Sequence, residues 1–134
     1  MPFQPYLFFN GRCDEAIEFY QKAVGAEVTG LLRFKQAPDP SMVRPETAEK
    51  VMHAHLRIGG GDLLVSDGMC AGETKFEGFA LTLSLATAAE VDRRFNALAE
   101  GGEVRMPLDK TFFSPRFGML TDRFGVGWMV MVEP

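Results

Sequence analysis

Apolar residues recur at helical spacing in two stretches of the chain, one beginning at Asp14 and one at Thr87. Gly25 follows the first stretch and Gly101-Gly102 follow the second, and glycine is common where a helix ends. Thr87 stands three residues before Glu90, which is the pattern of a capping box at a helix start. The apolar stripes of the two predicted helices are Ala16, Ile17, Tyr20, Ala23 and Val24, and Val91, Phe95 and Leu98.

Strand-like segments surround both helical stretches. One strand is predicted before each helix and three after it, so that each half of the chain has the order βαβββ. The predicted strands are 3–9, 27–34, 50–58 and 62–67 in the first half, and 79–85, 103–106, 112–121 and 127–133 in the second. This order predicts an α+β fold.

The two halves also resemble each other residue by residue. With an offset of 76, FYQKAVGAEV from Phe19 aligns with FNALAEGGEV from Phe95 at Phe, Ala, Gly, Glu and Val. A repeat of this length is too long for a solenoid unit. We therefore expect one domain of two βαβββ modules, at about residues 1–70 and 76–134, whose sheets line a cleft.

Three blocks carry a resemblance to a known superfamily: PYLFFNGRCDEAIEFYQKAVGAEV, VMHAHLRIGGGDLLVSD and FFSPRFGMLTDRFGVGWMVMVEP. Together with the doubled βαβββ order, they resemble the vicinal oxygen chelate superfamily, which includes glyoxalase I, extradiol dioxygenases and bleomycin resistance proteins. They are most similar to its PhnB-like branch, over essentially the whole chain. The resemblance implies the glyoxalase-like fold and a homodimer, but no particular activity, because the branch shares none.

Metal-dependent proteins of this superfamily hold an ion with four side chains, usually His and Glu, one from each of four strands. Carried over block by block, the resemblance implies that Pro5, Ala80 and Met129 occupy three of these positions, with Phe79 replacing Ala80 if the alignment slips by one residue. None of these side chains binds such a metal. The remaining position falls among Val65, Ser66 and Asp67. We therefore expect that the usual metal site is absent and that no cofactor is bound.

Side chains alternate between the two faces of a strand, so residues two or four positions from these predict the rest of the cleft lining. This alternation adds Leu7 and Phe9 beside Pro5, Thr82 and Ser84 beside Ala80, and Met131 beside Met129. The cleft is thus expected to be mostly apolar with a few hydroxyl groups, while Trp128 packs behind the sheet. Arg116 is expected near the rim, either as an anchor for a carboxylate or phosphonate or as a solvated side chain.

Both histidines of the chain lie on one predicted strand, in VMHAHLRIGGGDLLVSD. His53, His55 and Arg57 share one face of it, and the other face, with Ala54 and Leu56, should pack on a helix. If residues 59–61 form a three-residue loop, His53 lies opposite Asp67 and close to His55. A two-residue or four-residue loop moves Asp67 to the opposite face.

The group of His53, His55 and Asp67 has three interpretations. It contains the ligand set of a two-histidine, one-carboxylate metal site. It is also suited to hydrogen-bonding a ligand in the cleft, with neutral His53 and charged Asp67 as a proton-transfer pair. The third interpretation is a set of ordinary polar residues. Glycines 59–61 lie between two strands, which predicts a hairpin turn with positive φ and disfavours methyl transfer from S-adenosylmethionine.

Other features narrow the function less. Cys13 stands at a helix start, where a thiol is either activated or simply a small buried side chain, and Cys13 and Cys70 fit no zinc spacing. Asp122-Arg123-Phe124-Gly125 is interpreted as a structural turn. The segment 35–49, rich in proline and charge, is a lid, a dimer contact or a loop without function.

Charge and hydropathy exclude some classes of protein. A net charge of −4 over 134 residues argues against binding to nucleic acid. The apolar runs are far shorter than the roughly 20 residues needed to cross a bilayer, so no membrane association is expected. The start of the chain lacks the positive flank of a signal peptide. We therefore expect a cytoplasmic protein.

Two hypotheses about function follow. The first is a protein that binds a small, largely apolar molecule, neutral or anionic, in the cleft without a metal ion. The second is a metal-dependent lyase, isomerase or dioxygenase that uses a relocated site at His53, His55 and Asp67. The sequence does not decide whether the protein is an enzyme.

Overall fold

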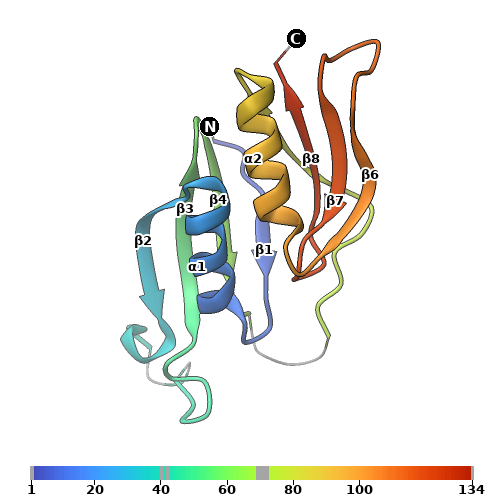
Figure 1. The fold of residues 1–134 in the computed structure, drawn as a ribbon. Coiled ribbons are helices and arrows are strands. Elements are labelled where there is room, and N and C mark those ends of the chain that lie inside the picture. Colours follow the sequence, from blue (N-terminus) through green and yellow to red (C-terminus); the bar gives the residue numbers. More distant parts are fainter. Residues whose placement is uncertain (1, 40, 42, 69–72, 134) are drawn as a thin grey trace. The chain divides into compact units, whose positions relative to one another are not determined.

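Each half of the chain folds into one helix and one four-stranded sheet (Figure 1). The computed structural model describes residues 2–39, 41, 43–68 and 73–133. The chain divides into two units, Met1–Thr74 and Lys75–Pro134, each with the order βαβββ. The predicted α+β fold of two βαβββ modules is confirmed. In the part of the chain that the structure describes, no helix has both the length and the apolar composition that crossing a bilayer requires.

The first unit holds a mixed sheet in the order β1-β4-β3-β2, in which β1 runs parallel to β4 and the other pairs are antiparallel. A short 3₁₀ helix, Phe34–Gln36, follows β2. The elements of this unit are β1 (Tyr6–Phe8), α1 (Cys13–Val24), β2 (Glu27–Arg33), β3 (Val51–Ile58) and β4 (Gly61–Ser66).

The second unit repeats this arrangement in the order β5-β8-β7-β6. Its elements are β5 (Leu81–Leu85), α2 (Ala88–Ala99), β6 (Glu103–Asp109), β7 (Phe117–Thr121) and β8 (Gly127–Val132). The strand predicted at 112–121 begins only at Phe117, because Thr111 and Ser114 hydrogen-bond to each other in a turn just before it. The strand predicted at 103–106 instead continues to Asp109.

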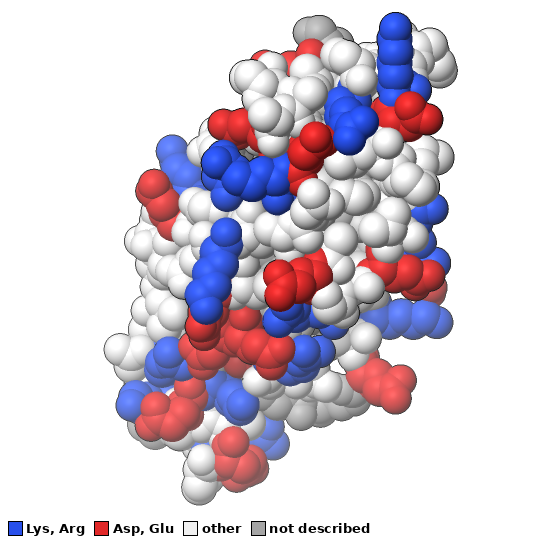
Figure 2. All heavy atoms as spheres, viewed as in Figure 1, with Lys and Arg blue, Asp and Glu red and all other residues white. Residues whose placement is uncertain are grey.

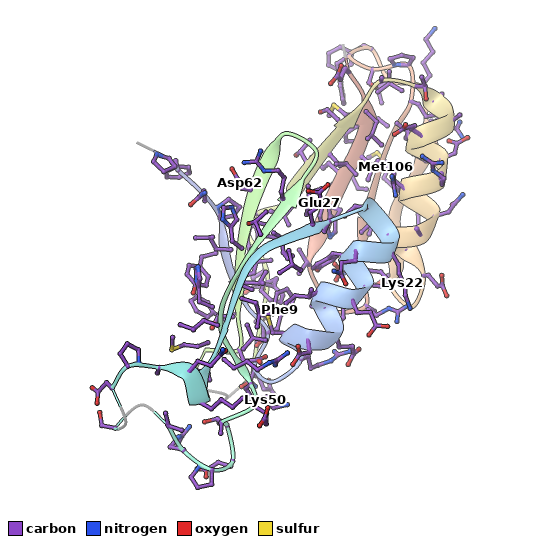
Figure 3. All side chains as sticks on the ribbon, turned by 90° about the vertical axis from the view of Figure 1, so that its left-hand side faces the viewer. Phe9, Lys22, Glu27, Lys50, Asp62 and Met106 are labelled. Carbon is purple, nitrogen blue, oxygen red and sulfur yellow. The ribbon has the colours of Figure 1, made fainter. Side chains whose placement is uncertain are left out.

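Helix α1 packs its apolar stripe on one face of the first sheet. The predicted stripe residues are buried, and Cys13 joins them. Ala54 and Leu56 of β3 are fully buried, which confirms that this side of β3 packs on a helix. Phe9, labelled in Figure 3, directly follows β1. Its ring contacts that of Tyr20 in α1, with centroids 6.3 Å apart. Burial of each large apolar side chain stabilises the unit by about 1.5–3 kcal/mol.

Helix α2 packs in the same way on the second sheet. The Thr87 hydroxyl accepts a hydrogen bond from the backbone N–H of Glu90, so Thr87 caps the helix as predicted. The predicted stripe of Val91, Phe95 and Leu98 is buried. Trp128 is also buried, and its indole N–H donates to Asp122 at 2.9 Å.

Asp122 closes the turn between β7 and β8. One of its carboxylate oxygens accepts hydrogen bonds from the backbone N–H groups of Phe124 and Val126, and the other accepts from Trp128. The carboxylate is buried, and all three donors belong to the turn and the strand after it. The predicted structural role of this turn is confirmed.

Charged side chains form local pairs on the molecular surface. On the face seen in Figure 2, Lys and Arg side chains are interspersed with Asp and Glu. Arg12 pairs with Glu15 at 2.7 Å and Lys22 with Glu18 at 3.1 Å, both along α1. Such exposed pairs contribute little to stability. Most of the stability therefore comes from the packing of the helices on the sheets.

Arg33 connects α1 to the segment between β2 and β3. Its guanidinium donates to both carboxylate oxygens of Asp14 at 2.9 Å and to the carbonyl oxygen of Glu49 at 2.7 Å. The backbone N–H of Phe34 donates to the carbonyl of Lys50, so the segment is also closed at its base. The long segment predicted at 35–49 is therefore anchored at both ends.

We expect Asp14→Asn to destabilise the protein at neutral pH and not in acid. The hydrogen bonds from Arg33 hold the pKa of Asp14 below its ordinary value of about 3.9. A lowered pKa in the folded state stabilises the protein above the ordinary value, and this contribution is lost as the pH falls through the folded-state pKa. Because Asp14 is partly exposed, the expected loss at pH 7 is only about 0.5 kcal/mol.

The measurement is urea unfolding of both proteins at a series of pH values. The difference between them should shrink once the pH falls below about 4. Glu18→Gln, in the exposed pair with Lys22, is the control and should show a smaller difference throughout. A difference for Asp14→Asn that stays constant down to pH 2 would contradict this account.

Gly118 of β7 allows α2 to approach the second sheet closely. A Cβ atom at this position would lie 2.6 Å from Cε2 of Phe95 and 2.8 Å from Cδ2 of Leu108. We expect Gly118→Ala to lower the free energy of unfolding by about 2 kcal/mol, because overpacking a filled core typically costs 1–3 kcal/mol. Thermal and urea unfolding measure this loss. Gly60→Ala, at a position with open space around it, is the control and should leave stability within about 0.5 kcal/mol of the parent.

Candidate functional site

The face of the first sheet opposite α1 carries the polar and aromatic side chains of this unit. Antiparallel partners share a face, and the pairs Ala54–Val65 and Leu56–Leu63 lie on the buried side with α1. The pairs His55–Leu64 and Arg57–Asp62 therefore lie on the other side. We call this side the open face of the first sheet; its residues on β1, β3 and β4 are Tyr6, Phe8, His53, His55, Arg57, Asp62, Leu64 and Ser66.

The hairpin between β3 and β4 has a two-residue turn, Gly59-Gly60, and Ile58 pairs with Gly61. The three-residue loop over 59–61, one of the alternatives raised by the sequence, is wrong, because Gly61 is the first residue of β4. Gly59 has a φ of 59°, which confirms the predicted positive φ and matches the first position of a type II′ turn. His55 consequently pairs with Leu64 and not with Val65.

Asp67 lies on the helix side and not with the histidines. Its side chain is 1% exposed, and one oxygen accepts hydrogen bonds from the backbone N–H groups of Gly11 and Cys13, at 2.8 Å each. The other oxygen accepts from the N–H of Val51 at 2.9 Å. The predicted contribution of Asp67 to a ligand or proton-transfer site beside His53 is wrong. Asp67 instead binds the start of α1.

The structure also contradicts the predicted metal site at His53, His55 and Asp67. Among the residues with described positions, no three His, Cys, Asp or Glu side chains come together in a group that could hold a metal ion. His53, His55 and Asp67 all belong to this part of the chain, and Asp67 points away from the two histidines. A metal-dependent site formed by this trio is therefore wrong.

Cys13 is the first residue of α1 and is completely buried. Burial, and the nearby carboxylates of Asp67 and Asp14, raise the pKa of its thiol. The thiol is therefore protonated at neutral pH, and Cys13 is the small buried residue of the two alternatives raised by the sequence. Cys70 lies outside the described residues.

The side chains of β1 alternate in the phase opposite to the predicted one. Leu7 and Phe9 are each 3% exposed and face α1, so their assignment to a ligand-binding face is wrong. Tyr6 and Phe8, at 40% and 49% exposed, lie on the open face of the first sheet. No charged or amide side chain within residues 5–9, Pro-Tyr-Leu-Phe-Phe, indicates which positions face solvent.

Tyr6, Phe8 and His53 form one cluster of rings on this face. The rings of Tyr6 and Phe8 stack with centroids 4.8 Å apart and planes inclined by 8°. The ring of His53 meets that of Tyr6 edge-on at 5.5 Å, and the Tyr6 hydroxyl shares a 2.8 Å hydrogen bond with Nδ1 of His53. Burial raises the pKa of Tyr6, so its hydroxyl keeps its proton. The cluster thus combines apolar ring surface with a directed polar pair.

Asp62 holds the second histidine. Nε2 of His55 donates to Oδ1 of Asp62 at 2.9 Å, and Arg57 approaches the same oxygen at 3.3 Å. The hydrogen bond from His55, and then the charge of Arg57, lower the pKa of Asp62. Asp62 lies beside the hairpin turn in Figure 3. Neither Asp62 nor Tyr6 was predicted as a site residue, although a two-residue turn in the sequence already pairs Asp62 with Arg57.

The second sheet has its own face opposite α2. Thr82 pairs with Met129, Ser84 with Met131, and Phe117 with Met131, and these side chains lie on the side opposite Trp128 and Val130. The face is apolar with two hydroxyl groups from β5. Ala80, half-buried, immediately precedes β5.

Arg116 does not lie at the edge of this face. Its Nε donates to Oδ1 of Asp92 in α2 at 2.7 Å. It alternates with Phe117 and so shares the helix side of the sheet with Gly118, whose surroundings include Phe95. Of the two alternatives raised by the sequence, an anchor for an anion or a solvated side chain, neither included this ion pair with Asp92.

Comparison with known proteins identifies the family. The family model described as 3-demethylubiquinone-9 3-methyltransferase matches residues 2–131. The chain belongs to this family. This is the PhnB-like family that the sequence blocks indicated, and its fold is shared with a glyoxalase/bleomycin resistance protein/dioxygenase domain from Frankia sp., with a TM-score of 0.63 at 18% identity.

Three relatives show how close this PhnB-like chain is to known proteins. It is 39% identical over 142 residues to protein YjdN of Escherichia coli, covering 98% of this chain and 95% of YjdN. The crystal structure of protein PA1353 from Pseudomonas aeruginosa has a TM-score of 0.88 and 42% identity, covering 99% and 98% of the two chains. A PhnB protein from Bacillus cereus has a TM-score of 0.81 and 27% identity, covering 98% and 99%.

We expect Asp67→Ala to destabilise the PhnB-like chain strongly. The substitution leaves the N–H groups of Gly11, Cys13 and Val51 without their acceptor, and an unsatisfied buried donor costs about 1–3 kcal/mol. The expected loss in the free energy of unfolding is therefore about 3 kcal/mol or more. Urea unfolding measures it, and Asp39→Ala is the control, since among the described residues this exposed carboxylate bonds to its close neighbour Ser41. Equal stability of the two variants would contradict this role of Asp67.

Proposed function

We propose that this PhnB-like protein binds a small, largely apolar molecule on the open face of its first sheet, without the metal site usual in the superfamily. The observation that carries the proposal is the pair of aromatic side chains, Tyr6 and Phe8. Both rings remain about half exposed, whereas the neighbouring side chains Leu7 and Phe9 are buried on the helix side.

The composition of the face supports a ligand with apolar surface. Tyr6, Phe8 and Leu64 supply apolar contact, and His53 and His55 add directed hydrogen-bonding groups at one side of it. Binding sites for small molecules commonly combine an apolar lining with a few placed polar groups. An apolar side chain that is merely exposed would have no ordered polar partner. Here the Tyr6 hydroxyl is hydrogen-bonded to His53, which favours a binding site.

The residues at the positions of the superfamily's metal ligands support binding without a metal ion. Met129 lies on the face opposite α2 among Thr82 and Met131, and a thioether is a poor ligand for hard divalent cations. Val65 and Asp67 face the helix side, where both are buried. On the described strands, the donor set therefore does not fit the four-ligand site of the superfamily.

The methyltransferase activity in the family's description is not part of this proposal. Cofactors with a phosphate or carboxylate are commonly held at a glycine-rich turn that leads into a helix. Here the turn Gly59-Gly60 joins two strands. Asp67 binds the start of α1 and Thr87 caps α2, so both helix starts are already occupied by the protein's own oxygen atoms.

The test is titration with N-phenyl-1-naphthylamine, an uncharged dye that fluoresces in apolar surroundings. We expect the dye to bind and Phe8→Ala to weaken its binding by about tenfold, because aromatic contacts contribute about 0.5–1.5 kcal/mol beyond buried area. Phe112→Ala removes a fully exposed aromatic ring in the second unit and is the matched control. Thermal unfolding checks that both variants are folded. Unchanged binding by Phe8→Ala would contradict the proposed site.

A further inference from the structure

We infer that the ligand of this open face is an aromatic molecule with an uncharged oxygen atom on its ring system, and that this oxygen accepts a hydrogen bond from Nε2 of His53. The inference rests on the proposed function and adds to it the chemical class of the ligand and the residue that recognises it. In this arrangement Tyr6 is a positioning residue, since it acts through His53.

The ring geometry favours an aromatic ligand over an aliphatic one. Tyr6 and Phe8 stack on each other with their planes inclined by only 8°, and both remain partly exposed, so a further flat ring can extend the stack. The edge-on approach of His53 to Tyr6 adds a third ring to the same cluster. Offset-stacked and edge-on contacts between rings stabilise more than their buried area alone, so a planar ligand gains most from this surface.

The hydrogen bond between Tyr6 and His53 occupies Nδ1 and leaves Nε2 for a ligand, and we take the Tyr6 hydroxyl as its donor. When the hydroxyl donates to Nδ1, the neutral imidazole carries its proton on Nε2. Among the residues whose positions are described, none hydrogen-bonds to Nε2 of His53. Nε2 then offers an N–H group to an acceptor on the ligand.

The surroundings of His53 favour an uncharged acceptor. Its cross-strand neighbour in β2 is Leu32, and Tyr6 contacts it on the side of β1. On β3 and β4, the charged side chains of this face are Arg57 and Asp62, which pair with each other, and Asp62 also accepts from His55. His55 is a weaker candidate for recognition, since its Nε2–H group is taken by Asp62. A carbonyl or ether oxygen fits His53 better than a carboxylate.

The test compares two probes that differ in one oxygen atom. 2-Acetylnaphthalene has a carbonyl acceptor on a naphthalene ring, and 2-ethylnaphthalene has the same ring without it. Both are measured by displacement of N-phenyl-1-naphthylamine from the intact protein. We expect the acetyl compound to bind about fivefold more tightly, which corresponds to one net hydrogen bond of about 1 kcal/mol.

Substitutions then assign the preference to named groups. His53→Phe keeps a ring and removes the donor, so it should bind both probes with equal affinity while still binding 2-ethylnaphthalene. Tyr6→Phe keeps the stacked ring and removes the hydroxyl, so it should reduce the preference without reducing affinity for 2-ethylnaphthalene. Phe112→Ala, in the second unit, is the control and should keep the full preference.

The outcomes separate this inference from the proposed function. If the unaltered protein binds both probes equally, or if His53→Phe keeps the preference, recognition of an oxygen by His53 is overturned while apolar binding at the face stands. If neither the dye nor the probes bind, the proposed function fails and the inference fails with it. Equal affinity for the acetyl compound in Tyr6→Phe and the parent protein would overturn the positioning role of Tyr6.

Discussion

The buried carboxylate of Asp67 fixes the arrangement of the first unit. It follows β4 directly, and its oxygens bind N–H groups at the start of α1 and at the start of β3. Its own N–H donates to the carbonyl of Val51. A slip of one residue between β3 and β4 would leave this carboxylate buried without its donors, which is far costlier than losing one strand pair. The register that places His53 and His55 opposite α1 therefore depends on Asp67.

The sequence predicted the helices well because their apolar stripes are unambiguous. Polar residues separate the apolar positions of α1 and of α2, so only one helix face was suited to burial. Alternation also placed Thr82 and Met129 on one side of the second sheet and Trp128 on the other. The phase of β1 was wrong because Tyr6, Leu7, Phe8 and Phe9 are all apolar. Only contacts with α1 decide which of them are buried.

The role of Asp67 could not be predicted for a different reason. Its partners are the backbone N–H groups of Gly11, Cys13 and Val51, which lie 16 to 56 residues away along the chain. Because every residue except proline has a backbone N–H group, the sequence does not indicate which ones Asp67 binds. Arg116 was misplaced because its partner, Asp92, lies in a helix whose packing the sequence does not specify. The position of Asp62 beside Arg57 could have been predicted, since a two-residue turn at Gly59-Gly60 pairs these two residues.

The two units share a fold but carry different chemistry on their open faces. In the first unit that face has aromatic rings and imidazoles, whereas in the second it has methionines, Phe117 and hydroxyl groups. The helix side of each sheet is filled by core residues, where a change of one methylene group already affects stability. Side chains on the open face, such as Tyr6 and Phe8, contribute less to that core because they are half exposed. Substitutions there alter what the face can bind while the fold persists, so ligand chemistry in this fold must be argued from the open-face residues of each protein and not from the fold itself.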